Sequence, residues 1–531
     1  MVTETRILPD RDSTAQPELV THPRILIFSA SLILKGLAGA VFFGSVDLVN
    51  AARGCLALFA GKQVDVPYFP VINAFLWFGG VLSATLAVPF PLSLKLVPIL
   101  FDSLLAVLIY DLVRRHQPRL ALRAGMLYAF SPLALLITSF QGQWDAIALF
   151  FLLLAFGLVE DSAHDPRKEV LFGVLFGISL LAKPIGLPFL LLFPMRKRRT
   201  WHIEWPAVLG LASAVAIAFL VFGHYGYSNL DRAIEVFAYS AKGVQTFGLP
   251  FAPLLSHLHI QALRLWVALP MVVLAVRYHR HKVTALDAML TFYLCCLATT
   301  GLSPQYILWP LPLLLATRRL RLAAFYTAVA TAFLLVYYSN PWTSYYASEN
   351  LGVFAPLRGF SWLIPPAALE KPELLPIVHA LGNVVFPVCA MVLAALVLKS
   401  APGQIADGHS RVDGSQGWLS RAAWYSAPFF LIFATILVTR SRVDASQLHS
   451  RLSEIWNALP GEYGLYIRSF EPTVVVVRDS AGFAVLNAIV LLGLFAAAWC
   501  CFCVCVTWRK MPRAQSDRGL PAAEAEPAKP M

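Results

Sequence analysis

The chain has 531 residues, of which 58% are hydrophobic and only 14% are charged, and its mean hydropathy is +0.67. Soluble domains contain about 25% charged residues, so this composition excludes a soluble enzyme, a disordered chain and a secreted disulfide scaffold. The formal charge of +12 matches the excess of Lys and Arg in the cytoplasmic loops of membrane proteins. We therefore expect an all-α polytopic membrane protein, with membrane lipid and no nucleic acid as a partner.

The predicted spans are apolar runs that are long enough, or nearly so, to cross a bilayer. In chain order they lie at 24–45, 71–90, 93–112, 120–140, 144–160, 168–195, 205–224, 260–277, 283–302, 305–317, 323–339, 375–398, 422–439 and 482–506. Clusters of Arg and Lys lie between them at 114–119, 167–168, 196–199, 277–282, 318–321 and 509–510. The positive-inside rule predicts that these clusters are cytoplasmic.

If every run crossed the membrane once, two of them would put a basic cluster on the outer side. We interpret 71–90 as an outer interfacial or re-entrant segment, with a helix broken at Gly79-Gly80. The run 168–195 has positive charge at both ends, and Pro184 interrupts it. We therefore expect two short helices that meet near Lys183. The result is a bundle of about fourteen transmembrane helices with both termini inside, outer loops and interfacial helices.

These assignments divide the chain into four parts. Residues 1–23 form a cytoplasmic N-terminal segment, and residues 24–320 form a first transmembrane module that includes an outer loop at 46–92. Residues 321–508 form a second transmembrane module with outer loops at 340–374 and 440–481. The Pro-, Ala- and Glu-rich tail at 509–531 is predicted to be disordered and cytoplasmic.

Acidic and amide side chains follow the first and fourth predicted spans on the outer side. Asp47 comes directly after the first span, with Asp65 and Tyr68 in the same loop. Capping of the next helix explains Asp47 at least as well as a functional role, since Asp is a favoured N-cap residue. Gln143 and Asp145 lie in a Gln-Gly-Gln-Trp-Asp segment, which suits either a tight turn or a site for sugar hydroxyls.

A lysine lies at the outer end of the predicted broken helix. The residues that flank Lys183 supply no counter-ion. A structural lysine can extend to the interface, but an uncompensated ammonium opposite a broken helix is a good phosphate ligand. We therefore favour phosphate binding. Gln305, Tyr306 and His224 also end outer helices, where a turn or an interfacial position explains them equally well.

Together these elements resemble a known family. They are Asp47, Tyr-Phe-Pro at 68–70, Lys-Leu-Val-Pro-Ile-Leu-Phe-Asp at 95–102, Ser-Pro at 131–132, Gly-Gln-Trp-Asp at 142–145, Leu-Ala-Lys-Pro at 181–184 and Ser-Pro-Gln-Tyr at 303–306. Their order and spacing over about residues 25–320 resemble the polyprenyl- or dolichyl-phosphate-sugar-dependent glycosyltransferases of the GT-C superfamily, particularly mannosyltransferase-like members. Many relatives carry two acids together in the first outer loop, whereas Asp47 and Asp65 are well separated; position favours Asp47.

The resemblance implies an integral membrane glycosyltransferase with a GT-C-like bundle, whose catalytic module is 24–320. Its donor would be a lipid-phosphate-linked hexose, most often mannose, and its acceptor a glycan, a glycolipid or a protein. Asp47 would be the general base of an inverting displacement, and Lys183 with His224 would neutralise the phosphate. The resemblance assigns sugar or phosphate binding to Asp65, Tyr68, Gln143, Asp145, Gln305 and Tyr306. It implies no nucleotide donor, no cofactor and no obligatory metal.

A transporter or flippase of lipid-linked sugars is the alternative function, because it shares many spans, broken helices and buried polar groups. The ionisable residues gather at one interface, which favours the transferase. However, Lys35, Asp102 and Asp287 lie within spans, where they can pair with one another. The many Arg and Ala residues suggest a plasma membrane of bacterial type with an extracytoplasmic site; the endoplasmic reticulum is the alternative location.

Overall fold

A computed structural model gives the fold of the chain. It describes residues 22–41, 46–59, 70–86, 90–159, 165–192, 204–222, 263–280, 282–299, 304–339 and 385–399, with residues 425 and 450. Within these residues every regular element is a helix, which confirms the all-α prediction. The predicted outer loop at 340–374, nearly all of the loop at 440–481, the tail at 509–531 and all but the end of the segment 1–23 lie outside the described residues.

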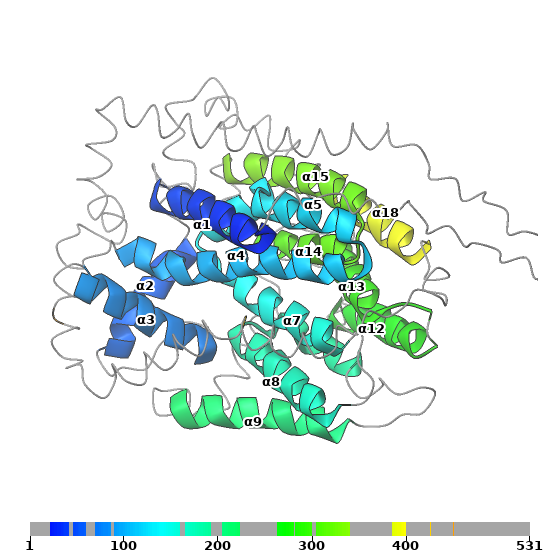
Figure 1. The fold of residues 1–531 in the computed structure, drawn as a ribbon, viewed down its shortest axis with the longest axis horizontal. Helices are drawn as coiled ribbons and strands as arrows, with labels where there is room; N and C mark the ends of the chain where they lie inside the picture. Colours follow the sequence, from blue (N-terminus) through cyan, green and yellow to red (C-terminus); the bar gives the residue numbers. More distant parts are fainter. Residues whose placement is uncertain are drawn as a thin grey trace, which may run out of the picture.

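The helices follow one another along the chain with short connections over the first half (Figure 1). They are α1 (Pro23–Val41), α2 (Val46–Phe59), α3 (Pro70–Leu86), α4 (Phe90–His116), α5 (Pro118–Ala129), α6 (Pro132–Ala134), the π-helix η1 (Leu135–Phe140), α7 (Asp145–Val159), α8 (Pro166–Ala182), the 3₁₀-helix η2 (Pro184–Leu192), α9 (Trp205–Phe222), α12 (Leu263–His279), α13 (Ala285–Thr299), the 3₁₀-helix η4 (Pro304–Leu308), α14 (Pro310–Ala316), α15 (Leu320–Ser339) and α18 (Phe386–Lys399).

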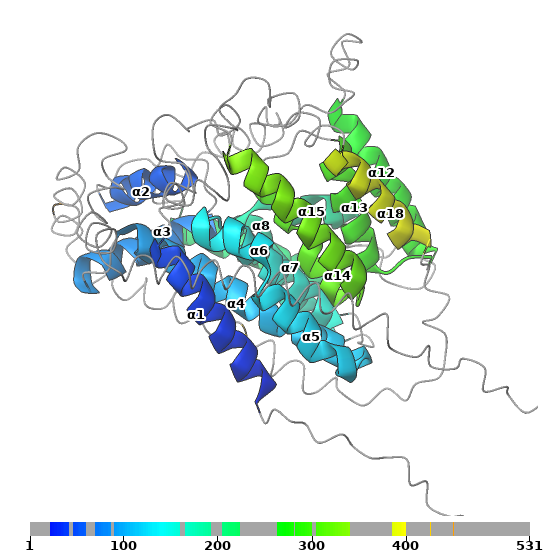
Figure 2. The same ribbon diagram turned by 90° about the horizontal axis from the view of Figure 1, so that it is seen from above.

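The helix α4 lies at the centre of the described bundle. It contacts α1, α3, α5, α7 and α14, and Figure 1 shows it running through the middle of the molecule. Its apolar side chains point in all directions, and Leu105, Leu108 and Ile109 are fully buried, as expected for a helix that is hydrophobic all round. In the turned view, α1 lies along one flank and α12 with α18 along the opposite flank (Figure 2).

A buried ion pair joins α1 to α4. The Lys35 ammonium lies 2.7 Å from Asp102 Oδ2, and both side chains are fully buried. The hydroxyl of Tyr128 on α5 donates to the other Asp102 oxygen at 2.5 Å, and the Lys35 ammonium lies 4.9 Å from the Tyr128 ring centroid. Charges at membrane depth are costly unless they are paired. The prediction that Lys35 and Asp102 can pair is confirmed.

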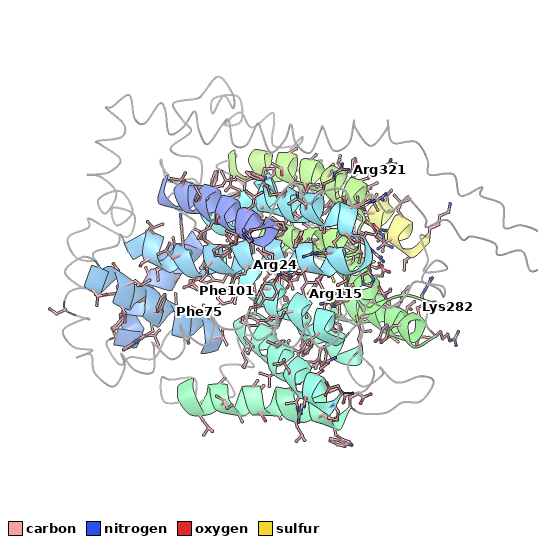
Figure 3. The ribbon with its side chains drawn as sticks, viewed as in Figure 1. Arg24, Phe75, Phe101, Arg115, Lys282 and Arg321 are labelled. Carbon is pink, nitrogen blue, oxygen red and sulfur yellow. The ribbon has the colours of Figure 1, made fainter. Side chains whose placement is uncertain are left out.

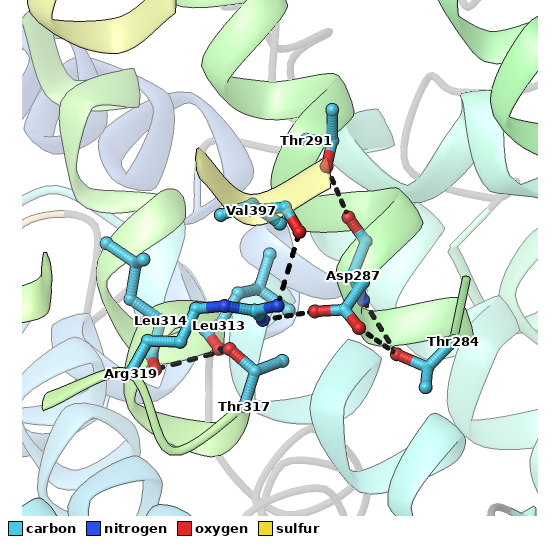
Figure 4. A network of polar contacts seen from close by, with 8 residues as sticks. All are labelled: Thr284, Asp287, Thr291, Leu313, Leu314, Thr317, Arg319 and Val397. Atoms are coloured by element: carbon cyan, nitrogen blue, oxygen red, sulfur yellow. Dashed lines mark hydrogen bonds and ion pairs between the residues drawn. The ribbon is translucent and has the colours of Figure 1, made fainter. Parts of the chain in front are cut away.

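The third intramembrane charge, Asp287, has a different partner. Its carboxylate forms an ion pair with Arg319 and accepts a hydrogen bond from the Thr284 hydroxyl at 2.9 Å (Figure 4). Arg319 also donates to the carbonyl oxygen of Val397 on α18 at 3.4 Å. This network ties α13, the α14–α15 turn and α18 together, so pairing of Asp287 with Lys35 or Asp102 is ruled out.

The predicted break at Gly79-Gly80 is wrong, because α3 is one continuous helix through both residues. A Cβ atom on Gly80 would lie 2.4 Å from Phe59 Cε2 and 2.6 Å from Cys55 Sγ, and one on Gly79 would lie 2.9 Å from Leu94 Cδ2. The two glycines therefore allow α3 to pack closely against α2 and α4. The interfacial placement of 71–90 remains a prediction.

The predicted break near Lys183 is confirmed. The helix α8 begins at an N-cap, Asp165, whose side chain accepts from Arg167 N at 3.0 Å. It ends at Ala182, and Lys183 is its extended C-cap. Pro184 opens η2, because proline cannot donate the next helical hydrogen bond and disfavours helical geometry in the residue before it.

The helices α8 and α9 lie side by side along one edge of the molecule (Figure 1), with glycines at their contact. A Cβ atom on Gly173 would lie 1.9 Å from Ala207 O, and one on Gly177 would lie 2.8 Å from Ala214 Cβ. A Cβ atom on Gly210 would lie 2.1 Å from Val170 O. Gly173 and Gly177 form a small-xxx-small pattern, which lets membrane helices approach closely.

Two helical stretches in the described part of the chain are long and apolar enough to cross a membrane, Leu92–His116 and Pro118–Phe140. Further apolar helical stretches are shorter, with 10–17 residues, such as Val71–Thr85 and Asp145–Leu158. Large apolar side chains on α1, α9, α12 and α18 are exposed, among them Ile33 at 62% and Leu220 at 81%, as expected of lipid-facing positions. The number of fourteen crossings remains a prediction.

Basic residues lie together at one end of the bundle. In Figure 3, Arg115, Lys282 and Arg321 lie toward one end and Phe75 toward the other. Arg115 donates to the carbonyl oxygen of Gly157 at 2.7 Å, so the C-terminal ends of α4 and α7 meet here. The positive-inside rule predicts that this end is cytoplasmic, and the N-terminal end of α7 points the opposite way.

A buried carboxylate on α4 joins distant parts of the chain. Asp111 Oδ1 lies 2.9 Å from Arg24 Nε at the start of α1. The hydroxyl of Tyr425, 314 residues further along the chain, donates to Asp111 Oδ2 at 2.5 Å. The Tyr425 ring lies 6.1 Å from that of Phe150 on α7. A residue of the predicted second module therefore packs into the core of the first.

Candidate active site

A turn at residues 141–145 leads from η1 into α7. Gly142 has φ +75°, a left-handed conformation that costs other residues roughly 1–2 kcal/mol. Gln141 N donates to Leu136 O and Gln143 N donates to Ile137 O, each at 3.1 Å. Widened π-helical turns of this kind often lie at functional sites. The predicted tight turn is confirmed, and Asp145 opens α7 directly after it.

Asp145 and Lys183 form an ion pair at this end of the bundle. Lys183 Nζ lies 2.7 Å from Asp145 Oδ2; the Asp145 side chain is fully buried and that of Lys183 is 21% exposed. The dipole of α7 stabilises a carboxylate at its first residue. One turn deeper, Ser179 Oγ donates to Ala148 O at 2.8 Å, which holds α8 against α7. The prediction that Lys183 lacks a counter-ion is therefore wrong.

Aromatic rings from η4 and from Trp309, the residue that follows it, line the same ion pair. The Lys183 ammonium lies 4.8 Å from the centroid of the Tyr306 ring, a distance at which a cation is attracted to the ring face. The Tyr306 and Trp309 rings lie 4.3 Å apart. Tyr326 OH donates to Ile307 O at 2.5 Å, which holds η4 in place. The structure thus brings three predicted site residues together: Asp145, Lys183 and Tyr306.

Trp309 completes this group, although the sequence analysis did not identify it. Its Nε1 donates to Asp145 Oδ1 at 2.6 Å. Trp309 N donates to Tyr306 O at 3.1 Å, and side chains three residues apart that are joined by such a 3₁₀-type bond lie on one face. The spacing of Tyr306 and Trp309 was therefore a signal for this position. We call Asp145, Lys183, Tyr306 and Trp309 the outer cluster.

The first helical turn of α2 lies against the loop at residues 141–145. A Cβ atom on Gly142 would lie 3.2 Å from both Leu48 Cδ1 and Lys95 Cγ. Lys95 is fully buried, and its ammonium donates to the carbonyl oxygens of Gly39 at 3.3 Å and Phe140 at 3.4 Å. Asp47 precedes Leu48 within α2, so its backbone lies beside the turn; its side chain is outside the described residues.

The other predicted site residues are placed only in part. Gln143 is buried next to Asp145 in the chain, and Gln305 is half-buried in η4. Asp65, Tyr68 and His224 lie outside the described residues. Among the residues that the structure describes, no three His, Cys, Asp or Glu side chains come together to hold a metal ion. The expectation that no metal is required remains a prediction.

The family model of dolichyl-phosphate-mannose-protein mannosyltransferases matches residues 66–222. The resemblance to this family is confirmed. We found no match to the chain among curated proteins and none among solved structures.

The matched stretch, which we call the mannosyltransferase region, extends through α3 to α9. It contains the 141–145 turn and the Asp145–Lys183 ion pair, whereas Asp47 precedes it and η4 follows it. The family indicates a membrane-bound glycosyltransferase of the GT-C type, with a lipid-linked sugar as donor in general.

Proposed function

We propose that the chain transfers a hexose, with mannose as the expected sugar, from a polyprenyl-phosphate donor to a hydroxyl of a glycan, glycolipid or protein. The observation that supports this most directly is the Asp145–Lys183 ion pair, which lies inside the mannosyltransferase region and in which the Lys183 side chain is 21% exposed. A lysine ammonium has three donors, so Lys183 can hold Asp145 and a phosphate oxygen together.

Asp47 is the proposed general base. It takes the proton of the acceptor hydroxyl, while the hydroxyl oxygen attacks the anomeric carbon of the donor. The bond from that carbon to the phosphate oxygen breaks, and its electron pair leaves with the phosphate, whose charge Lys183 and His224 neutralise. A single displacement of this kind inverts the anomeric carbon. The position of Leu48 against the Gly142 turn supports the proximity of Asp47 to the outer cluster.

The outer cluster lies at the N-terminal end of α7, and the arginines lie at its C-terminal end. With the basic end in the cytoplasm, the proposed reaction takes place on the extracytoplasmic face. We propose a plasma-membrane location, with the endoplasmic reticulum as the alternative. Asp65, Tyr68, Gln143, Gln305 and Tyr306 are proposed to hold the sugar or the phosphate, and neither a cofactor nor a metal is required.

The ion pairs of the buried charges weaken the case for a transporter. Lys35, Asp102 and Asp287 are each engaged in an ion pair, so none of the three can bind a coupling ion or a substrate without breaking that pair. The two functions separate in detergent, where no compartments exist. A transferase converts a labelled polyprenyl-phosphate mannose and an acceptor to a new glycoside, whereas a flippase forms no new bond.

Asp47→Asn is expected to lower transfer by about 10²–10⁴-fold, because an amide cannot accept the acceptor proton. The measurement is turnover of labelled donor, with the amount of folded protein followed by size-exclusion chromatography. Asp65→Asn tests the other candidate base in the same loop. Asp165→Asn is the matched control, since it changes a carboxylate at the opposite end of the bundle and Asn also caps helices well.

The base assignment is wrong if Asp47→Asn keeps more than about a tenth of the activity, or if Asp65→Asn alone removes it. The configuration of the product provides a second check on the same mechanism. Nuclear magnetic resonance of the new glycosidic linkage should show the anomer opposite to that of the donor; retention would rule out the single displacement.

A further inference from the structure

Trp309 and Lys183 hold the two oxygens of one carboxylate. The Trp309 indole donates to Asp145 Oδ1 at 2.6 Å, and the Lys183 ammonium lies 2.7 Å from Asp145 Oδ2. Asp145 is fully buried, so neither oxygen can rely on bulk water for its hydrogen bonds. The indole and the ammonium therefore stabilise the same negative charge, each at a different oxygen.

The three groups differ in how firmly they are held. Trp309 lies between two rings, with centroids 4.3 Å from Tyr306 and 5.0 Å from Tyr293, and it directly precedes α14. Tyr293 in turn donates to Ile185 O at 2.9 Å, just after Lys183. Lysine, by contrast, is a point charge on a flexible four-carbon stem. The rigid indole therefore determines where the carboxylate points, and the carboxylate determines where the ammonium rests.

We propose that Trp309 is a positioning residue for the donor phosphate site. Its hydrogen bond orients the Asp145 carboxylate, which holds the Lys183 ammonium over the Tyr306 ring, in the place where a phosphate oxygen binds. Trp309 itself touches no substrate. The consequence for sugar transfer rests on the proposed function, whereas the coupling of Trp309 to Lys183 through Asp145 does not.

The coupling can be tested without any activity. Ultraviolet resonance Raman spectra report the hydrogen bonding of an indole, and the chain has 13 tryptophans. The difference between the wild type and Trp309→Phe isolates the signal of Trp309 from that of the others. Asp145→Ala should shift the Trp309 band to that of an indole without a partner. Asp145→Asn, which keeps an acceptor of similar shape, should give an intermediate shift.

Lys183→Met should also shift the Trp309 band, although Lys183 does not bond to the indole, because Asp145 loses its other partner. Addition of farnesyl phosphate to the wild type should shift it as well. A Trp309 band that stays unchanged in Asp145→Asn and in Lys183→Met would overturn the proposal.

The functional consequence is measured as binding and as kinetics. A hydrogen bond to a charged group lost in Trp309→Phe should weaken farnesyl phosphate binding and raise the donor KM by about tenfold. The acceptor KM and kcat should remain nearly unchanged. Trp77→Phe is the matched control, since Trp77 is a buried indole on α3 that stacks at 4.1 Å on Phe59, a residue outside the outer cluster.

A double variant separates positioning from general destabilisation. In the Asp145→Asn background, Trp309→Phe should add little further loss of phosphate affinity, because both changes break one chain of contacts. Independent, additive losses, or equal rises in donor and acceptor KM, would overturn the proposal. If the wild type transferred no sugar, the proposed function would fail, while farnesyl phosphate binding and the Raman band would still decide the role of Trp309.

Discussion

At the scale of single residues, the outer cluster combines a paired cation with a lysine side chain that is 21% exposed. Asp145 takes up part of the Lys183 charge, which lowers the cost of keeping an ammonium at the membrane boundary before the donor arrives. The Tyr306 ring adds attraction without adding a second negative charge. Under the proposed function, the donor phosphate meets an ammonium that is already oriented, and such preorganised charge is often the largest contribution to catalysis.

Removal of that ammonium should affect the donor selectively. Lys183→Met keeps most of the apolar stem and removes the charge, so kcat/KM for the lipid-phosphate donor should fall by about 10²-fold. The acceptor KM should change little. Steady-state rates with each substrate varied in turn measure both effects.

The matched control is Lys168→Met, which removes a buried lysine at the opposite end of the same helix. This control should leave donor and acceptor kinetics as they are in the wild type. Equal losses for donor and acceptor in Lys183→Met would remove the phosphate role of Lys183.

The residue types of the site were predictable, but their partners were not. The Gly-Gln-Trp-Asp and Lys-Pro motifs located Asp145 and Lys183 correctly at one end of the bundle. Their ion pair spans 38 residues, so the local sequence around Lys183 could not reveal it. The contact of Trp309 with Asp145 spans 164 residues, and it depends on how α7 packs against the junction of η4 and α14.

At the scale of elements, glycines set the distances between helices. The contact of α8 with α9 has no room for a side chain at Gly173, since a Cβ atom there would overlap a backbone carbonyl on α9. A backbone atom cannot move aside as a flexible side chain can, so the helices themselves must separate. Because α8 carries Lys183 at its end, this packing also sets the position of the ammonium.

Gly173→Ala should lower stability by about 1–3 kcal/mol, the usual cost of overpacking a close contact. The apparent melting temperature in detergent measures the effect. Gly36→Ala is the matched control, because a Cβ atom on Gly36 of α1 meets nothing within 4 Å. Since Ala favours a helix over Gly, this control should keep or slightly raise the melting temperature. Equal melting temperatures for the two variants would contradict the packing argument.

Proline was a better guide to these elements than glycine. Pro184 ends α8 where the sequence predicts a break, because the covalent structure of proline acts wherever it stands. Gly79-Gly80 did not break α3. Glycine permits a bend but also permits close packing, and the choice depends on neighbouring helices that the sequence alone does not place.

At the scale of the whole molecule, the buried ion pair between Lys35 and Asp102 connects the first helix to the central one. The composition and hydropathy of the chain predicted the helical membrane class, and the basic clusters predicted which helix ends lie together. The pairing itself was one of several combinations that the sequence allowed. Asp287 proved to pair with Arg319, since these helices pack at a distance from α1 (Figure 2).

Lys35→Met should destabilise the bundle by about 3–5 kcal/mol, because it leaves the Asp102 carboxylate buried with Tyr128 as its remaining partner. The double variant Lys35→Met with Asp102→Asn removes both charges and keeps an acceptor for the Tyr128 hydroxyl. It should recover most of the lost stability. Thermal unfolding in detergent compares the two, and a double variant less stable than Lys35→Met would contradict this account.

The hydrogen bond from Tyr425 to Asp111 has a consequence for biogenesis. During translation, Asp111 enters the membrane with Arg24 already made, but Tyr425 emerges 314 residues later. Until then, one oxygen of this carboxylate on the central helix lacks the hydroxyl that serves it in the finished protein. The ribosome must therefore complete most of the polypeptide before the corner between α1, α4 and α7 can close, and a chain that terminates early would remain open there for quality-control machinery to recognise.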